Sequence, residues 1–148
     1  MHTLAVLVAL TSMTPMDIEI MVAALAERVD AGLQAFPEAG KKARISEICV
    51  ADLDGRDLPA AIVERVAGPT IKIYQRSRCP RVLRDTSIDL RLGPPRALSP
   101  KQSEVRWGVP GAGGTLLVCR QGTRWKVCGG MANAIGTSPT PPRPSGKP

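Results

Sequence analysis

Residues 14–36 read TPMDIEIMVAALAERVDAGLQAF, and this stretch has the most regular apolar pattern in the chain. Its first four residues form a capping box with proline in the first turn, which is typical of a helix start. Apolar residues then recur at steps of three and four, at Ile18, Met21, Val22, Leu25, Val29, Leu33 and Phe36. Because such a stripe lies on one face of a helix and must be buried, we expect a helix that packs on a sheet and ends before Pro37.

The next segment has the pattern of a strand, a short helix and a second strand. Branched and small apolar residues predict strands over 45–51 and 70–77. Between them, residues 58–67 have the pattern of a short helix that Asp57 would cap, and Asp54-Gly55 predicts a turn before it. This part of the chain is therefore predicted to be a β-α-β unit.

The chain from residue 87 onward alternates as strands do. Strands are predicted over 87–92, 103–109, 115–120 and 124–128. A phosphate-binding loop requires a helix directly after it, and a strand follows the glycine-rich stretch 110–114, so we predict a hairpin connection there. The predicted class is α+β, with a long N-terminal helix packed on a curved, mainly antiparallel sheet that includes the β-α-β piece.

The length of 148 residues fits one domain, which we expect to span residues 14–131. Residues 1–13 contain a short apolar run with small residues nearby, which predicts a signal peptide. No Lys or Arg precedes that run, so a buried strand or an extension of the helix is the alternative. Residues 132–148 are predicted to be a disordered tail, because from Gly136 onward they contain five prolines and no large apolar residue.

Four cysteines, Cys49, Cys79, Cys119 and Cys128, form an even set. An even number suits disulfides in an oxidising compartment and leaves three pairings open, with four reduced, buried thiols as the alternative. The spacings fit neither the usual zinc sites nor a CxxC redox site. We expect a periplasmic or secreted protein, with a cytoplasmic location as the alternative. No apolar run reaches the roughly 18 residues of a membrane span, so no transmembrane segment is predicted.

Composition removes most acid–base chemistry. The one histidine is His2, so a Ser-His-Asp or Cys-His site has no base, and an HExxH zinc helix is absent. The acidic run 52-DLDGRD-57 has glycine at its fourth position and Val63 at its twelfth, which differs from the EF-hand order. We therefore predict no catalytic residue, no metal site and no cofactor.

Charge is divided unevenly along the chain. Residues 1–69 carry 6 basic and 10 acidic residues, whereas residues 70–126 carry 12 basic and 3 acidic ones. Most of the latter cations are arginines, whose planar guanidinium suits bidentate contact with carboxylate or phosphate. The predicted partner-binding surface consists of Lys72, Arg76, Arg78, Arg81, Arg84, Arg106 and Arg124. Further alternating positions predicted to face solvent are Arg91, Arg120 and Lys126.

Three interpretations of this basic surface stay open. It is a solvated face that keeps the protein soluble, or it binds an anionic partner, or it binds nucleic acid. The anionic partner would be an envelope polymer, an anionic lipid surface or an acidic protein. Nucleic acid is the less favoured partner, because single-strand binders rely on aromatic stacking and this chain has only Phe36, Tyr74, Trp107 and Trp125.

The long helix, the short helix and a meander that ends in 122-GTRWKV-127 resemble cystatin-like and NTF2-like proteins. The segments 47-EICVA-51, 57-DLP-59 and 77-SRC-79 also resemble small exported bacterial proteins. The resemblance implies a long helix in the concave face of a bent antiparallel sheet. The β-α-β piece departs from it, and no catalytic residue is carried over.

We therefore predict a non-enzymatic, exported binding or accessory protein. One alternative is an NTF2-like pocket protein, enzymatic or binding a small molecule, which would need inward-facing carboxylates or Tyr74 in a cavity beside the helix. The other alternative is a cytosolic nucleic-acid-binding protein, whose binding would be sensitive to salt.

Overall fold

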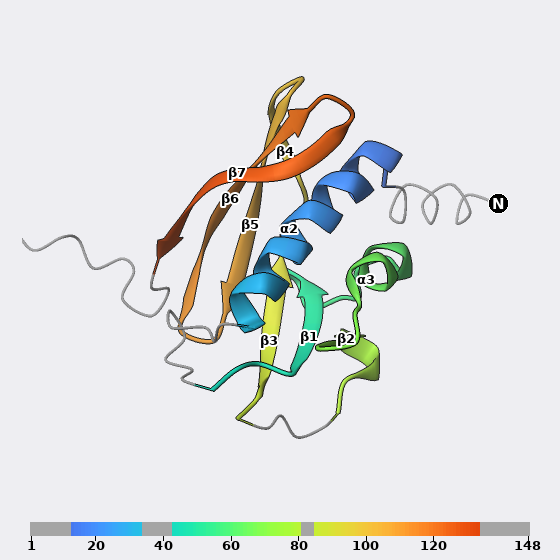
Figure 1. Ribbon diagram of the computed structural model, residues 1–148, viewed down its shortest axis with the longest axis vertical. Coiled ribbons are helices and arrows are strands. Elements are labelled where there is room, and N and C mark those ends of the chain that lie inside the picture. The colour runs from blue at the N-terminus through green and yellow to red at the C-terminus, as the bar shows by residue number, and fades with distance from the viewer. Residues whose placement is uncertain (1–12, 34–42, 81–84, 134–148) are drawn as a thin grey trace, which may run out of the picture.

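The structure, a computed structural model, describes residues 13–33, 43–80 and 85–133. Within these ranges the chain forms an α+β fold with two α-helices and an open, mixed sheet of seven strands (Figure 1). The elements are α2 (Pro15–Leu33), β1 (Glu47–Asp52), α3 (Ala60–Val66), β2 (Lys72–Gln75), the 3₁₀-helix η2 (Arg76–Arg78), β3 (Ser87–Leu92), β4 (Arg96–Ser99), β5 (Gln102–Val109), β6 (Ala112–Gln121) and β7 (Arg124–Asn133). Neither described α-helix is long and apolar enough to cross a membrane.

The strand order is β2-β1-β3-β5-β6-β7, and β4 pairs with the first half of β5. β1 runs parallel to both β2 and β3, and the later pairings are antiparallel. α3 connects β1 to its parallel neighbour β2. The α+β class and the β-α-β piece predicted from the sequence are therefore confirmed.

Both helices lie on one face of the sheet, which we call the inner face (Figure 1). Ile48 and Val50 of β1 and Leu90 of β3 are fully buried there in one core cluster with Met21 and Leu25 of α2. Because side chains alternate along a strand, the intervening residues point to the opposite, outer face. The outer face includes Glu47, Cys49, Lys72, Tyr74, Asp89, Arg91, Glu104, Arg106, Gly108, Thr115, Leu117, Arg124, Lys126 and Met131.

The capping box predicted at the start of α2 is confirmed. The Thr14 hydroxyl accepts a hydrogen bond from the Asp17 backbone N–H at 3.0 Å, and the Asp17 carboxylate accepts one from the Thr14 N–H at 3.4 Å. Residues 34–36 of the predicted helix lie outside the described part of the chain. An ion pair between Arg65 of α3 and Glu19 of α2 joins the two helices, and its hydrogen bond holds the pKa of the Glu19 carboxyl below its usual value.

The predicted cap of the short helix is wrong. α3 begins after Pro59, two residues beyond Asp57, and no side chain caps it. The Asp57 carboxylate instead accepts hydrogen bonds from the backbone N–H and the hydroxyl of Ser77, at 2.8 and 2.5 Å. Asp57 therefore fastens η2 to the loop before α3 instead of capping the helix.

Strand limits differ from prediction in the second half of the chain. The hairpin connection predicted at 110–114 is confirmed but is shorter than expected, because the turn contains only Pro110 and Gly111 and β6 follows directly. Gly111 has a φ of 82°, which glycine adopts without steric cost and which closes a tight hairpin. β4 escaped prediction because all four of its residues are exposed, so no apolar alternation marks it. β7 continues past residue 128 to Asn133, into the segment assigned to the tail.

Two disulfides select one of the three pairings left open by the sequence, Cys49–Cys79 and Cys119–Cys128. The first joins the outer face of β1 to the residue that follows η2, so it holds the start of the β2–β3 connection against that face. The second joins the neighbouring strands β6 and β7. Both are consistent with an extracellular location.

Removing each disulfide separately should cost unequal amounts of stability. Cys49–Cys79 closes 30 residues and Cys119–Cys128 closes 9, and a longer closed loop restricts the unfolded chain more. We expect Cys49→Ala with Cys79→Ala to lower the free energy of unfolding by about 3–4 kcal/mol, and Cys119→Ala with Cys128→Ala by about 2–3 kcal/mol. Urea unfolding followed by circular dichroism measures both, and the reverse order would contradict this account.

Candidate functional site

The outer face carries more cations than its carboxylates can pair. Among the described residues of this face, the carboxylates of Glu47, Asp89 and Glu104 each have a partner. These partners are the Ser87 hydroxyl at 2.8 Å, Arg76 at 3.0 Å and Arg96 at 2.6 Å, in that order. The outer-face cations that form no ion pair with any described residue are Lys72, Arg91, Arg106, Arg124 and Lys126. This face therefore keeps a surplus of positive charge.

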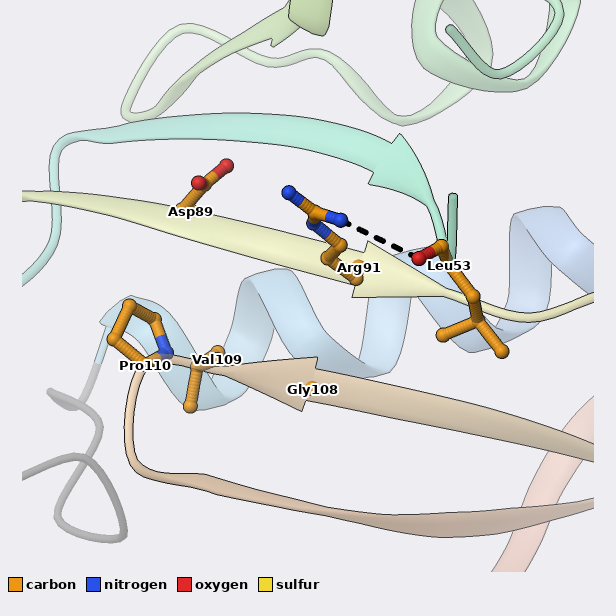
Figure 2. Close-up of a pocket in the computed structure, with 6 residues that line it drawn as sticks. All are labelled: Leu53, Asp89, Arg91, Gly108, Val109 and Pro110. Atoms are coloured by element: carbon orange, nitrogen blue, oxygen red, sulfur yellow. Dashed lines mark hydrogen bonds between the residues drawn. The ribbon is translucent and has the colours of Figure 1, made fainter. Parts of the chain in front are cut away.

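A cleft of about 340 Å³ lies on the outer face where β3 and β5 part (Figure 2). The two strands pair only at Arg91 and Leu92 of β3, and β5 then ends in the turn at Pro110. Asp89 and Arg91 stand on one side of the cleft, and the backbone of Gly108 runs along the other (Figure 2). Gly108 has no side chain, so its backbone forms that wall of the cleft.

The Arg91 guanidinium is held in place by the turn after β1. Its Nη1 donates a hydrogen bond to the Leu53 carbonyl at 3.3 Å (Figure 2). The guanidinium also lies against Gly55, where a Cβ atom would come within 3.4 Å of Nη1 and where φ is 85°. The Asp52 carboxylate fixes this turn by accepting backbone hydrogen bonds from Asp54 and Arg56 at 2.8 and 2.9 Å. The turn thus orients Arg91 and does not consume its charge.

Arg106 is a further cation on the same face. It precedes Gly108 by two residues in β5, and Gly108 pairs with Arg91, so the two arginines are diagonal neighbours about 7–8 Å apart at the backbone. The Leu53 side chain and the Arg106 Cβ meet above Gly93, where an added Cβ would lie 3.0 and 3.5 Å from them. Gly93 therefore lies next to both Leu53 and Arg106, and Arg91 and Arg106 are both outer-face residues.

η2 supplies a third arginine to this region. Nη1 of Arg76 donates to both oxygens of Asp89, at 3.0 and 3.1 Å, so the charge of the cleft carboxylate is already balanced. η2 itself is positioned by Asp57 through the two hydrogen bonds from Ser77. Those hydrogen bonds, together with the nearby charge of Arg78, hold the pKa of the Asp57 carboxyl below its usual value.

The predicted partner-binding residues have different places in the structure. Lys72, Arg78, Arg106 and Arg124 are exposed and unpaired among the described residues. Arg76 is exposed but committed to Asp89. The positions predicted at Arg81 and Arg84 lie outside the described residues.

Arg91 was absent from the predicted partner-binding set, although the sequence placed it at a solvent-facing position. The signal was the clean alternation over residues 87–92, which makes Arg91 an outward residue. The alternation could not reveal that Arg91 pairs with Gly108, because that pairing depends on the register of two strands whose residues are 17 positions apart in the sequence. Only that register places Arg91 and Gly108 on opposite walls of one cleft.

The outer face suits anion binding better than acid–base chemistry or base stacking. No group of three His, Cys, Asp or Glu among the described residues is placed to hold a metal ion. Trp107 and Trp125 lie on the inner side with the core, which leaves Tyr74 as the aromatic residue that the described outer face contains. Stacking of successive bases would need several such rings on one face.

A second cavity, of about 420 Å³, lies on the inner side between α2 and β7. Its walls include Glu27 and Arg28 of α2, with Trp107, Leu116 and Val127 from the sheet. Arg28 is only 7% exposed, and its guanidinium carbon lies 4.1 Å from the centre of the Trp107 ring. Its Nε is paired with Glu27 at 2.8 Å. Tyr74, which the NTF2-like alternative would need in a cavity of this kind, is on the outer face.

No protein-family model, curated protein or solved structure matches this chain. The resemblance to cystatin-like and NTF2-like proteins and to small exported bacterial proteins therefore stays a prediction.

The hydrogen bonds of Asp57 give the protein a pH dependence of known sign. A carboxyl whose pKa is lowered by folding adds stability above its unfolded pKa of about 3.9, and that stability is lost as the pH falls through the folded value. We expect Asp57→Asn to lower the free energy of unfolding at pH 7 by less than about 1 kcal/mol, because the site is exposed. The difference from the unmodified protein should shrink below about pH 4.

The control for this measurement is Asp54→Asn, which removes an exposed carboxylate that accepts no hydrogen bond from the described residues. Its unfolding free energy, measured by urea titration from pH 7 to pH 3, should follow that of the unmodified protein. A deficit of Asp57→Asn that stays constant down to pH 3 would contradict the assigned role of the charged carboxylate.

Proposed function

We propose that this protein is a non-enzymatic, exported binding protein whose outer face receives a carboxylate-rich partner, an acidic protein. The observation that carries the proposal is that Arg91, which lines the outer cleft, and its diagonal neighbour Arg106 both lack a carboxylate partner among the described residues. Unpaired surface cations are common as solubilising groups. These two differ because one is oriented by a fixed turn and opens onto a cleft beside a glycine.

Geometry supports a carboxylate as the bound group. A guanidinium offers parallel N–H donors that match the two oxygens of a carboxylate, and such charge-assisted pairs are stronger than neutral hydrogen bonds. Nη1 of Arg91 is occupied by the Leu53 carbonyl, which leaves its other nitrogen atoms for a partner. Leu53 is 40% exposed and offers an apolar contact next to the charge. Such a contact suits a polypeptide, which has apolar side chains, better than a polyanionic chain of sugar phosphates.

The other predicted partners fit less well. Nucleic acid would be expected to use an aromatic platform, and the described outer face offers Tyr74 alone.

Export is supported by the two disulfides, which persist in an oxidising compartment. The placement of α2 on one face of the sheet supports the proposed cystatin-like or NTF2-like arrangement, from which the parallel strands β2, β1 and β3 depart.

Binding of poly-L-glutamate to the full chain tests the proposal. Arg91→Glu with Arg106→Glu should weaken binding at least about tenfold, because it removes the oriented guanidinium of Arg91 and the neighbouring charge of Arg106. The matched control, Arg44→Glu with Lys101→Glu, changes the net charge equally at exposed residues outside the cleft and should weaken binding less than about twofold. Affinity should also fall between about 50 and about 200 mM salt.

Two outcomes would overturn the proposal. Equal losses in the two double variants would mean that net charge alone attracts the polymer. Tighter binding of single-stranded DNA than of poly-L-glutamate, at the same salt concentration and chain charge, would assign the face to nucleic acid. Circular dichroism of each variant confirms that the sheet has formed before binding is compared.

A further inference from the structure

β7 is the edge of the sheet, and none of the described residues pairs with its free side. At ten residues it is as long as any strand in the fold, and it contains no proline. Its charged residues, Arg124 and Lys126, lie in the first half, and Cys128–Met131 is uncharged and exposed. Long exposed edges normally carry charges, proline or a cover along their length, because unpaired N–H and C=O groups attract another strand.

The α2–β7 cavity lies directly beside the uncharged half of this edge. Its wall on the sheet side includes the backbone of residues 128–131. Gly130 pairs with Leu116, and a Cβ at Gly130 would come within 2.9 Å of the Thr115 carbonyl oxygen, so glycine is required there. Leu116 and Trp107, each only 4% exposed, line the cavity beside Gly130 and give it an apolar floor.

The charged first half and the uncharged second half of β7 therefore suit different side chains in a partner strand. Lys126 pairs with Cys119 and Gly130 pairs with Leu116 on the neighbouring strand β6. These two partners are three residues apart, so Lys126 and the cavity at Gly130 are separated by about 10 Å along the sheet. A partner strand beside β7 would place acidic side chains next to Arg124 and Lys126 on the outer side. It would place an apolar side chain next to Gly130 on the inner side.

We propose that β7 receives an extended acidic segment of the partner as an added strand, with one large apolar side chain seated in the α2–β7 cavity. Backbone hydrogen bonds to a sheet edge supply affinity, and side-chain pockets beside the edge supply specificity. The inference deepens the proposed function and rests on it for the acidic character of the partner. A second copy of this chain is the less complementary occupant, because its own β7 brings further cations and no carboxylate.

The test uses the full chain and the synthetic peptide Glu-Val-Glu-Val-Thr-Phe-Thr-Val, with its reversed sequence to cover both strand directions. Alternate residues of an added strand direct their N–H groups to opposite edges. Methylating one alternate set of peptide nitrogens should therefore weaken binding about tenfold or more, and methylating the other set should leave binding unchanged. Equal effects of the two methylated sets would overturn strand addition.

The cavity is tested by Val127→Phe, which enlarges a side chain in its wall. This substitution should weaken binding of the phenylalanine peptide about tenfold and leave unchanged the binding of a peptide with alanine in place of phenylalanine. Leu98→Phe is the control, because Leu98 is 46% exposed on β4 and outside the cavity. Equal effects on both peptides would overturn the cavity assignment. The methylated peptides, used on the unmodified protein, keep the proposal testable even where Val127→Phe does not fold.

The two proposals fail separately. Loss of the asymmetry between methylated peptides, with poly-L-glutamate still sensitive to Arg91→Glu and Arg106→Glu, removes the added strand and keeps the anion-binding face. If the two methylated peptides differ but poly-L-glutamate binding is insensitive to Arg91→Glu with Arg106→Glu, strand addition is supported and the anion-binding face is overturned. A dimer seen by sedimentation that persists at saturating peptide would overturn the inference in favour of a second copy on the edge.

Discussion

The packing of two helices on a single face of the sheet is the arrangement on which the rest of the structure depends. Burial of Ile48, Val50 and Leu90 beneath α2 and α3 fixes which residues of β1 and β3 point inward. Side chains on a strand alternate, so the same burial sends Asp89 and Arg91 to the outer face. A shift of one residue would place those charges in the core, where an unpaired charge is very costly. The inner core therefore specifies the chemistry of the outer face.

The outer cleft depends on backbone features that carry no charge. β3 and β5 separate because the two-residue turn at Pro110 and Gly111 ends β5, and the backbone of Gly108 forms one wall beside the parting strands. The turn at Gly55 then brings its own backbone against Arg91. The Cys49–Cys79 disulfide adds a second constraint on the same face, since it holds the chain after η2 against β1. Charge and shape at this site thus come from different parts of the sequence.

Sequence periodicity predicted β3, whose burial alternates, and it failed at β4 and at the start of β6. The limits of β3 match because apolar residues 88, 90 and 92 alternate strictly with outward ones. β4 has four exposed residues and so gives no pattern, and the glycines at the start of β6 resemble a loop although they continue the ladder. Asp57 shows a further limit of sequence patterns. Its position just before the short helix suggested a helix cap, but its hydrogen bond with Ser77, 20 residues away, depends on the fold. For the same reason, a solvent-facing Arg91 could be predicted and its cleft could not.

The outer face and the β7 edge contribute to recognition through different physics. Attraction by Arg91, Arg106, Arg124 and Lys126 acts over roughly 8–10 Å and weakens as salt rises. Hydrogen bonds to an edge strand and burial of an apolar side chain act only on contact and depend little on salt. Lys126 belongs to both features, because its side chain lies on the outer face and its backbone lies in the edge strand. A partner drawn in by charge would therefore arrive next to the edge, where backbone pairing selects an extended segment over a flexible polyanion.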